Sequence, residues 1–557
     1  MMTRSTKRIC WREKPWWRTG DILYMFRKLL SNIFHGVINT LSDYSSLLFS
    51  KIGLEPIIIT TPYAALKQWE SKTLQAKRAG GAKRIAIMAI RNGTWVEWAV
   101  FAAHKIYNMG YQPVVIYDEG DVKNIYFPNK VSPTGINFWK EFLSLDYIEK
   151  YDLNLYFESE DKKEITASYL DFVGEYAHTV AAYNLRVEEY ESHVMVEDYK
   201  KEYGNAQNML MTAAVALNNL LKNIQIDTFL CPSGLIDQSA AALEVTKRLN
   251  IRSIFIEGWA MRPGHLIWAF NRPALDYDVE GWMKVLGEWN SEKEKDSNDF
   301  KKFQERLSLT RDDEWLENFH PVQRRTKQDK YSRELEEFLM RPGTLFLCGT
   351  NVVGDSATLR RATIYKNQKE WLSGLVDYFK NHPEYRLLIR AHPDEAWQKA
   401  KVKIGDYVAE LKKGINNIYV IKGDEDINTY SLAERADIGL AWLSNIGVDM
   451  VIRGKPVIMA ANPKYGNLNI VEIPKTREEY FRKIEQMAAN PTPPSKDAIN
   501  RAKYYQRILF KEMSLEAIGK NYSSIEYRLG KNRIHPDQEK FYRILVGELD
   551  EKGRKMA

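Results

Sequence analysis

The segment from Ala436 to Tyr465 constrains the fold more than any other part of the 557-residue chain. It opens with Ile438 to Leu443, a short apolar run of the length of a buried strand. Ser444 and Asn445 interrupt this run, and because both are common N-cap residues, a short apolar helix is predicted to follow them. Gly454 ends that helix, and the apolar run KPVIMA comes next. This order of strand, turn, helix and strand predicts a piece of a parallel α/β sheet.

The turn at Ser444 and Asn445 is the first candidate for a binding site. At the carboxyl edge of a parallel sheet, such a turn directs backbone N–H groups and the positive end of a helix dipole toward one point, which suits a phosphate. Asp449, in the first turns of the helix, could accept hydrogen bonds from ribose or sugar hydroxyls. An ordinary crossover with an N-cap and no ligand explains the same residues about equally well.

Three further predicted strands end in polar loops. They are Thr344–Leu347, which leads to Asn351, Tyr385–Ile389, which leads to Arg390-Ala391-His392-Pro393, and Asn417–Ile421, which leads to Lys422. Right-handed crossovers place all these strand ends on one edge of a parallel sheet. The arginine, the histidine, the lysine and the Ser-Asn turn together therefore predict an anion-binding crevice at that edge.

From about Gly343 to Tyr465 the chain resembles the capsule polysaccharide synthesis family, the Kdo-transferase-like glycosyltransferases of bacterial capsule and surface-polysaccharide pathways. The matching pieces are a strand followed by RAHP, the run VIKGDEDINTYSLAERADIGLAWLS, and the run SNIGVDMVIRGKPVIMAANPKY. In that family a helix carries G-x-E-A before a G-K-P-V strand. Here Gly447-Val448-Asp449-Met450 occupies that place, so the acid is one methylene shorter. The amino-terminal half resembles the family only in layout.

That half has a Rossmann-like order of its own. Lys83–Ile90 is predicted to be a strand, Trp95–Met109 a helix and Gln112–Tyr117 the next strand. After a long helical region, Thr228–Leu230 leads into a Pro-Ser-Gly turn, a helix and the strand Ser253–Ile256. Two such halves predict two Rossmann-like domains rather than one.

The predicted fold class is therefore α/β and GT-B-like, with two Rossmann-like domains facing a cleft and with added amino-terminal, linker and carboxyl-terminal helices. In this plan the donor nucleotide sits on the second domain and the acceptor faces the first. The predicted units are an aromatic and basic helical segment, an acceptor domain, a charged helical connector, a donor-nucleotide domain and a helical tail, at residues 1–80, 81–272, 273–341, 342–494 and 495–557.

Glycosyl transfer requires cations or N–H groups at the leaving phosphate while an acceptor hydroxyl attacks an oxocarbenium-like centre. Arg390 offers a planar, bidentate fork for such a phosphate. His392 is the predicted general acid, because an imidazole pKa of about 6.5 lets it donate near neutrality; a loop histidine with a structural bond is the alternative. The predicted donor-nucleotide-binding residues are Arg390, Lys422, Ser444, Asn445, Gly447, Asp449 and Asn351.

On the acceptor side, Glu97 follows the turn of the first strand and Glu257 ends the last strand of that half. Either carboxylate is a candidate base for an acceptor hydroxyl, and either could instead cap a helix or bind a sugar hydroxyl. Arg91, Asn92 and Arg262 are the predicted acceptor-binding residues, suited to an anionic or hydroxyl-rich group.

A metal site is considered and not favoured. Asp424 and Asp426 form a D-x-D string, a pattern that binds divalent metal in another class of glycosyltransferase. Here the string precedes a predicted helix at Asn428 and Thr429, so acidic groups near a helix N-terminus explain it more simply. The three cysteines are widely separated and give no metal or disulfide spacing. No cofactor is predicted apart from the nucleotide-sugar as a co-substrate.

The net charge of +7 is modest for this length and suits anionic substrates or a phospholipid surface, without indicating nucleic acid. No stretch approaches the ~20 apolar residues that span a bilayer, and no signal peptide is predicted. Tryptophans and basic residues alternate between Trp11 and Phe34, which suits a helix lying on anionic lipid; packing on the catalytic body is the alternative. We expect a cytoplasmic protein with peripheral contact to the inner face of the membrane.

The predicted function is a metal-independent glycosyltransferase that moves a sugar from a nucleotide-activated donor to a glycan or lipid-linked acceptor in surface or capsular polysaccharide biosynthesis. Two alternatives stay open. One is a polyol-phosphate transferase of the teichoic-acid type, which would need a second histidine in the acceptor half; His104 lies inside a predicted helix, so His265, after Glu257, is the good candidate. The other is an inactive scaffold with the same fold.

Overall fold

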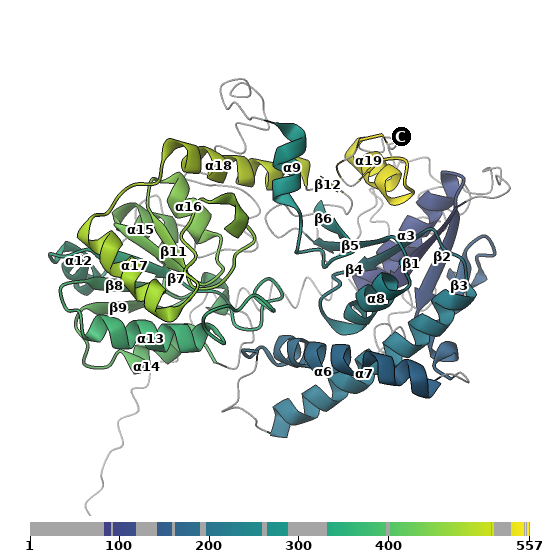
Figure 1. The fold of residues 1–557 in the computed structure, drawn as a ribbon, viewed down its shortest axis with the longest axis horizontal. Helices are drawn as coiled ribbons and strands as arrows, with labels where there is room; N and C mark the ends of the chain where they lie inside the picture. The colour runs from purple at the N-terminus through teal and green to yellow at the C-terminus, as the bar shows by residue number, and fades with distance from the viewer. Residues whose placement is uncertain are drawn as a thin grey trace, which may run out of the picture.

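The structure is a computed structural model. It describes residues 83–90, 93–118, 142–158, 162–189, 197–258, 265–287, 331–396, 402–513, 515–516, 536–550, 552 and 554–555. Two lobes lie side by side, each built on its own sheet (Figure 1). The mixed α/β architecture with two Rossmann-like sheets confirms the predicted fold class.

The first lobe is built on a seven-stranded sheet in the order β12-β6-β5-β4-β1-β2-β3. Neighbouring strands from β5 through β3 pair in parallel, whereas β6 runs antiparallel to β5 and β12 antiparallel to β6. The strands are β1 (Arg84–Ala89), β2 (Gln112–Tyr117), β3 (Glu149–Asp152), β4 (Thr228–Pro232), β5 (Ser253–Gly258), β6 (His265–Phe270) and β12 (Leu515–Glu516).

Helices cover this sheet, and α6 and α7 form a long antiparallel pair below it (Figure 1). Alanine-rich stretches of α7 and α8 allow these helices to approach the buried strands closely, and both helices share a core with β1, β2 and β4. The helices are α3 (Gly93–Asn108), α6 (Lys162–Leu185), α7 (Glu197–Asn223) and α8 (Asp237–Arg248).

The second lobe has a five-stranded, wholly parallel sheet in the order β11-β10-β7-β8-β9. Its strands are β7 (Leu345–Gly349), β8 (Arg386–Arg390), β9 (Ile418–Ile421), β10 (Ile438–Ala441) and β11 (Val457–Met459). Its helices are α12 (Arg333–Met340), α13 (Gln368–Lys380), α14 (Ile404–Leu411), α15 (Thr429–Arg435), α16 (Ile446–Ile452) and α17 (Arg477–Ala489). All five strands were predicted from their apolar runs.

Part of the predicted connector belongs to the second lobe. In α12, Leu335 and Phe338 are fully buried, and Arg386 at the start of β8 donates hydrogen bonds to the carbonyls of Phe338 and Leu339, at 3.2 and 2.8 Å. The charged residues of α12 lie on its other face, which explains why this segment resembles a solvated connector in sequence.

The tail crosses back to the first lobe. Its first helix, α18 (Lys496–Arg507), packs on α16 and continues into a π-helical turn, Ile508–Glu512. After β12, helix α19 (Pro536–Leu545) lies beside α3 and β6, where Phe541 contacts Trp98 and Trp268 (Figure 1). The predicted helical tail therefore also contributes a strand to the first sheet.

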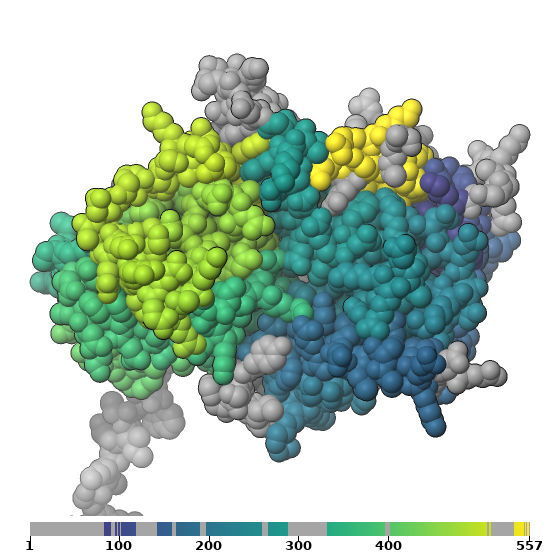
Figure 2. Space-filling model, viewed as in Figure 1, coloured from purple at the N-terminus to yellow at the C-terminus, as the bar shows by residue number. Residues whose placement is uncertain are grey.

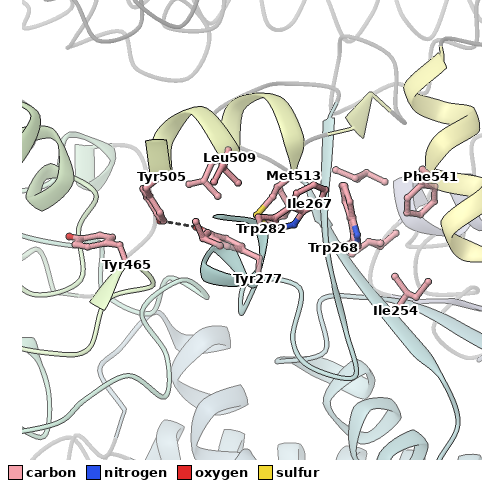
Figure 3. Packing of buried hydrophobic residues seen from close by; sticks show 14 of the residues in the cluster. Ile254, Ile267, Trp268, Tyr277, Trp282, Tyr465, Tyr505, Leu509, Met513 and Phe541 are labelled. Carbon is pink, nitrogen blue, oxygen red and sulfur yellow. Dashed lines mark hydrogen bonds between the residues drawn. The ribbon is translucent and has the colours of Figure 1, made fainter. Parts of the chain in front are cut away.

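One apolar cluster runs through both lobes and the tail. Figure 3 shows three rings side by side: Tyr465 of the second lobe, Tyr505 of α18 and Tyr277 of the first lobe. Beyond Tyr277, the cluster continues to Trp268 and Phe541. The hydroxyls of Tyr277 and Tyr505 are 3.2 Å apart. Helix α9 (Val279–Leu286) contributes Trp282 to the same cluster. The lobes are therefore joined by buried contacts as well as by the chain.

The lobes also meet along a polar seam, visible where the green and blue surfaces touch in the space-filling view (Figure 2). Arg361 of the second lobe pairs with Asp276, and Arg360 pairs with Glu175 of α6. Arg186 donates a 2.9 Å hydrogen bond to the carbonyl of Gly354. Among the residues described, no helix combines the length and the apolar character needed to cross a membrane.

Candidate functional site

The second sheet changes direction between β7 and β10. Starting from β7, the chain adds β8 and β9 on one side and β10 and β11 on the other. In open parallel sheets a crevice forms at the carboxyl ends of the strands at such a point, and ligands bind there. Gly349 ends β7, and a Cβ at this position would lie 2.5 Å from Ile446 Cγ2. Glycine thus allows the start of α16 to pack against the end of β7, beside the crevice.

Asn351 holds the two sides of this crevice together. Its Oδ1 accepts a 3.1 Å hydrogen bond from the backbone N–H of Leu443, just after β10. Its own backbone is clamped by the buried Gln368, which accepts from Asn351 N at 2.7 Å and donates to Asn351 O at 3.0 Å. The predicted donor residue Asn351 is therefore at the crevice, where part of its side chain already has a structural partner.

The turn at Ser444 forms as a capped strand-to-helix turn. Ser444 Oγ accepts from Ile446 N at 3.4 Å, and Ser444 O accepts from the hydroxyl of Tyr465 at 2.7 Å. Asn445 is exposed, in a helical conformation. Gly447 is required because a Cβ there would lie 2.4 Å from the Tyr465 hydroxyl. The Tyr465 hydroxyl therefore binds the turn at Ser444 and packs closely against it at Gly447.

Asp449 faces the tail in this structure. Its Oδ1 accepts a hydrogen bond from Nε2 of Gln506 in α18. The carboxylate that the sequence placed near a ribose or sugar is thus bound to a helix of the tail, a partner that lies 57 residues away in the chain. Sequence reasoning had no signal for that contact.

Arg390 occupies a buried structural position. Its side chain is 1 % exposed, and its guanidinium donates to the carbonyls of Lys422, Glu425 and Ile427, the last two at 3.2 and 3.1 Å. Burial lowers the pKa of Arg390 to about 10, so the group stays charged at neutral pH. These bonds fix the loop between β9 and α15, and they use the N–H groups that the sequence assigned to a donor phosphate.

His392 lies in the turn after β8, with 28 % of its side chain exposed. Its backbone N–H donates to Thr350 Oγ1 at 3.1 Å, which ties the turn after β8 to the end of β7. Its ring Nδ1 accepts from the backbone N–H of Asp394 at 3.2 Å. Since Nδ1 is an acceptor, the neutral ring carries its proton on Nε2 and presents an N–H donor.

Glu395 is a supporting residue that the sequence analysis missed. Its carboxylate accepts from the N–H groups of Ile404 and Gly405 at 2.9 and 3.3 Å and so caps α14. It is fully buried, and burial raises its pKa to about 7. Because the residue sits in the 3-10 turn Pro393–Ala396, this cap anchors the turn that carries His392. The acidic pair Asp394-Glu395, directly after RAHP in the sequence, could have indicated such a residue.

Lys422 lies farther out. Its ammonium pairs with Asp406 at 2.6 Å, and this carboxylate raises its pKa; both side chains are about half exposed. In the D-x-D string, Glu425 accepts from Lys422 N at 2.6 Å, while Asn428 caps α15 by accepting from Tyr430 N at 2.8 Å. Among the residues described, no three metal-binding side chains cluster.

The acceptor lobe contributes Glu257 at the end of β5, where one carboxylate oxygen accepts from Gly258 N at 3.2 Å. The charge of Glu257 raises the pKa of Lys464, after β11, so the end of β5 lies near the loop that follows β11. Glu97 lies in α3, and its side chain is not described. Arg91, Asn92 and Arg262 lie outside the described residues.

A separate hollow of about 630 Å³ lies at the seam between α6 and the loop after Arg360. None of the predicted site residues lines it. Both of its arginines are paired, Arg360 with Glu175 and Arg477 with Glu370. It is therefore distinct from the crevice at the switch point.

Two Rossmann-like lobes, each built on its own sheet, define the class of the molecule as a GT-B-like α/β protein. Residues 313–491, about a third of the chain, match the model of a family described as capsule polysaccharide biosynthesis protein. Over this segment, which holds the whole second sheet, the resemblance to the capsule polysaccharide synthesis family is confirmed. No curated protein sequence matches the chain.

Solved structures with some similarity include two bacterial enzyme classes. The β-Kdo 2,7 transferase of KpsC from Thermosulfurimonas dismutans is 13% identical, with 52% of this chain and 79% of that chain covered and a TM-score of 0.29. The UDP-GlcNAc 2-epimerase from Neisseria meningitidis bound to UDP-GlcNAc is 12% identical, with 76% and 95% covered and a TM-score of 0.25. Likeness at this level assigns no activity to the chain.

Proposed function

We propose that this protein is a glycosyltransferase that moves a sugar from a nucleotide-activated donor to a glycan or lipid-linked acceptor in surface-polysaccharide biosynthesis. The observation that carries the proposal is the match of residues 313–491 to the capsule family, on the lobe in which Asn351, His392 and the Ser444 turn follow neighbouring strands of one parallel sheet. Glu257 of the other lobe raises the pKa of Lys464 of this lobe, which supports a site shared by both lobes.

In the donor crevice, His392 and the Ser444 turn are the groups best placed to meet the leaving phosphate. The Nε2–H of neutral His392 would donate a hydrogen bond to a phosphate oxygen and stabilise the charge that develops there. Protonation of Nδ1 would break the bond from Asp394 N, so we assign His392 the role of hydrogen-bond donor before that of general acid. Arg390 acts on the site by holding the loop that carries Lys422.

On the acceptor side, Glu257 is the proposed base for the attacking hydroxyl. It is the described carboxylate at the end of a parallel strand that faces the second lobe. We propose that no metal ion or cofactor takes part, since protein N–H groups and cations supply the charge stabilisation. Transfer should then persist in excess EDTA; loss of activity that Mn²⁺ or Mg²⁺ restores would make Asp424 and Asp426 the ligands.

The experiment is a binding and transfer screen with CMP-, CDP-, UDP- and GDP-activated sugars, comparing wild type with His392→Gln. His382→Gln is the matched control, because this histidine of the same lobe stacks between Tyr378 and Tyr385 at the end of α13. We expect His392→Gln to lower transfer by about 10²-fold or more, a typical effect for one stabilising donor, with little change in the control. A wild-type protein that binds none of these donors would refute the function.

For the polyol-phosphate alternative, the structure describes His104 but not the side chain of the candidate His265. His104 is fully buried in α3 and bonds to the hydroxyl of Tyr147, and burial lowers its pKa to about 3. It is therefore a core residue. His265 begins β6, and its side chain is not described.

A further inference from the structure

Lys464 occupies the junction of the donor crevice and the first lobe. It lies in the loop after β11, which ends at Met459, and precedes Tyr465, whose hydroxyl donates a hydrogen bond to the carbonyl of Ser444. Its ammonium lies 5.2 Å from the centre of the Tyr277 ring, which comes from the first lobe. Figure 3 shows Tyr277 approaching Tyr465 and Tyr505 at this junction. The lysine is half-buried, and charged groups of both lobes act on its ammonium, Asp276 and Glu257 from the first lobe and Arg361 and Asp355 from the second.

Each charged group around Lys464 has a partner of its own. Asp276 pairs with Arg361, Asp355 accepts from Ala357 N at 2.8 Å, and Glu257 accepts from Gly258 N. Lys464 itself makes neither an ion pair nor a hydrogen bond with any residue in the described part of the chain. An ammonium held in this position without an acceptor is costly unless a ligand supplies one.

The pKa of the Lys464 ammonium is lowered by its surroundings. Burial, and then the charge of Arg361, lower its pKa to about 7, while Asp276, Asp355 and Glu257 act in the opposite direction. Tyr277 adds a favourable ring contact without accepting a conventional hydrogen bond. An anion that enters the crevice would favour the charged form and bind a proton together with the ligand.

We infer that Lys464 is a substrate-binding residue that receives an anionic group of the donor, either a phosphate of the nucleotide or a carboxylate of the sugar. This inference rests on the proposed function and specifies the chemistry of its donor site. Tyr277 of the acceptor lobe contacts the same ammonium, so a donor bound to Lys464 would lie next to both lobes. The lysine would thus complete an anion site that Arg390, buried beneath its loop, does not supply.

The test uses the full chain and three variants. Lys464→Met removes the charge at similar length, Lys464→Arg keeps it, and Lys475→Met is the matched control at an exposed lysine of the same lobe. Binding of CMP, CDP, UDP and GDP is measured by calorimetry from pH 6 to 8.5. A second arm compares UDP-glucuronic acid with UDP-glucose and CMP-N-acetylneuraminic acid with CMP.

If the lysine binds phosphate, Lys464→Met weakens bare nucleotide about tenfold or more, as for a charged hydrogen bond, and Lys464→Arg largely restores it. Wild-type affinity then falls above pH 7, by up to about tenfold per unit, and the Met variant lacks this extra dependence. If the lysine binds a sugar carboxylate, bare nucleotide binds both proteins equally, and the Met variant loses only the preference for the acidic donors. Either result supports the inference.

Two results would overturn it. The first is a folded Lys464→Met protein that melts at or above the wild-type temperature and binds every probe with wild-type affinity and pH dependence. Lys464 would then have only a packing role. A wild-type protein that binds none of the probes would remove the proposed function together with this inference. The control variant should match wild type in every arm.

Discussion

Single buried ionisable side chains hold the loops at the carboxyl ends of the second sheet in place. Arg390 gathers three carbonyls of one loop, and Glu395 gathers two N–H groups at the start of a helix. Both side chains are about 1 % exposed. Groups of this kind position the residues around them, because each would leave several polar partners unsatisfied if it were removed.

Replacement of Arg390 by alanine should therefore damage the fold before it damages binding. We expect a loss of about 3 kcal/mol in the free energy of unfolding, since several buried carbonyls lose their donor. Urea unfolding of Arg390→Ala against wild type measures this, with exposed Arg333→Ala of α12 as control. An unchanged unfolding midpoint, with weaker nucleotide binding, would return Arg390 to the role that the sequence suggested.

Glu395 predicts a pH effect. Its pKa is about 7 in the folded protein against an ordinary 4.5, so the folded state binds the proton more tightly. The stability from this group is present in full below pH ~4.5 and is lost as the pH rises through 7. Between pH 4.5 and 8, wild type should lose about 3 kcal/mol relative to Glu395→Gln. Parallel pH profiles of the two proteins in chemical unfolding would contradict this.

At the scale of elements, the turn between β10 and α16 depends on one glycine and one tyrosine. A Cβ on Gly447 would meet the Tyr465 hydroxyl at 2.4 Å, and the same hydroxyl binds Ser444 O. We expect Gly447→Ala to destabilise the protein by about 1–3 kcal/mol through overpacking. In a Tyr465→Phe background the penalty should shrink, giving a coupling of about 1 kcal/mol in a double-mutant cycle. Strictly additive effects would show that the clash is relieved elsewhere.

The elements that were predictable from sequence are those whose pattern is set by burial alone. Strands β7 to β11 are apolar because helices cover both faces, and each was predicted. Strand β3 (EKYD) is half-buried at a sheet edge and carries no apolar pattern. Strand β6 pairs with β5, its neighbour in the chain, whereas β12 depends on a distant partner, since it pairs with β6 from a position about 250 residues later. Long-range pairing of this kind leaves no local signal.

For the site, the sequence predicted which strand ends converge but not where their side chains point. Asn351, His392 and Ser444 follow the neighbouring strands β7, β8 and β10, and hydrogen bonds link the ends of these strands. Arg390 is the last residue of β8 rather than the first of the loop, so it points into the lobe. Asp449 accepts a hydrogen bond from Gln506 of the tail, a contact that the sequence did not predict. Lys464 was not considered, because the position gains its meaning only from Tyr277 in the other lobe.

At the scale of the whole molecule, association with membrane is a prediction about a segment outside the described residues. Trp11 to Phe34 combines indole rings with clustered arginine and lysine. Each basic residue gains about 1 kcal/mol near anionic lipid. Full-length protein should float with anionic liposomes, and a chain beginning near Gly53 should not. Equal recovery of both in the soluble fraction would indicate that the segment packs on the protein.

Because the tail returns to the first lobe, the carboxyl-terminal part of the chain completes the core of the amino-terminal part. Arg252 bonds to the carbonyls of Ile544 and Leu545, and Phe541 fills the space between Trp98 and Trp268. A backbone cut between Gly287 and Tyr331 would therefore produce two fragments that stay assembled, because the second fragment carries a part of the first lobe. A stop codon after Ala489 would instead expose those tryptophans and lead to aggregation. Fragment complementation, rather than separate production of the lobes, is thus the natural way to take this molecule apart.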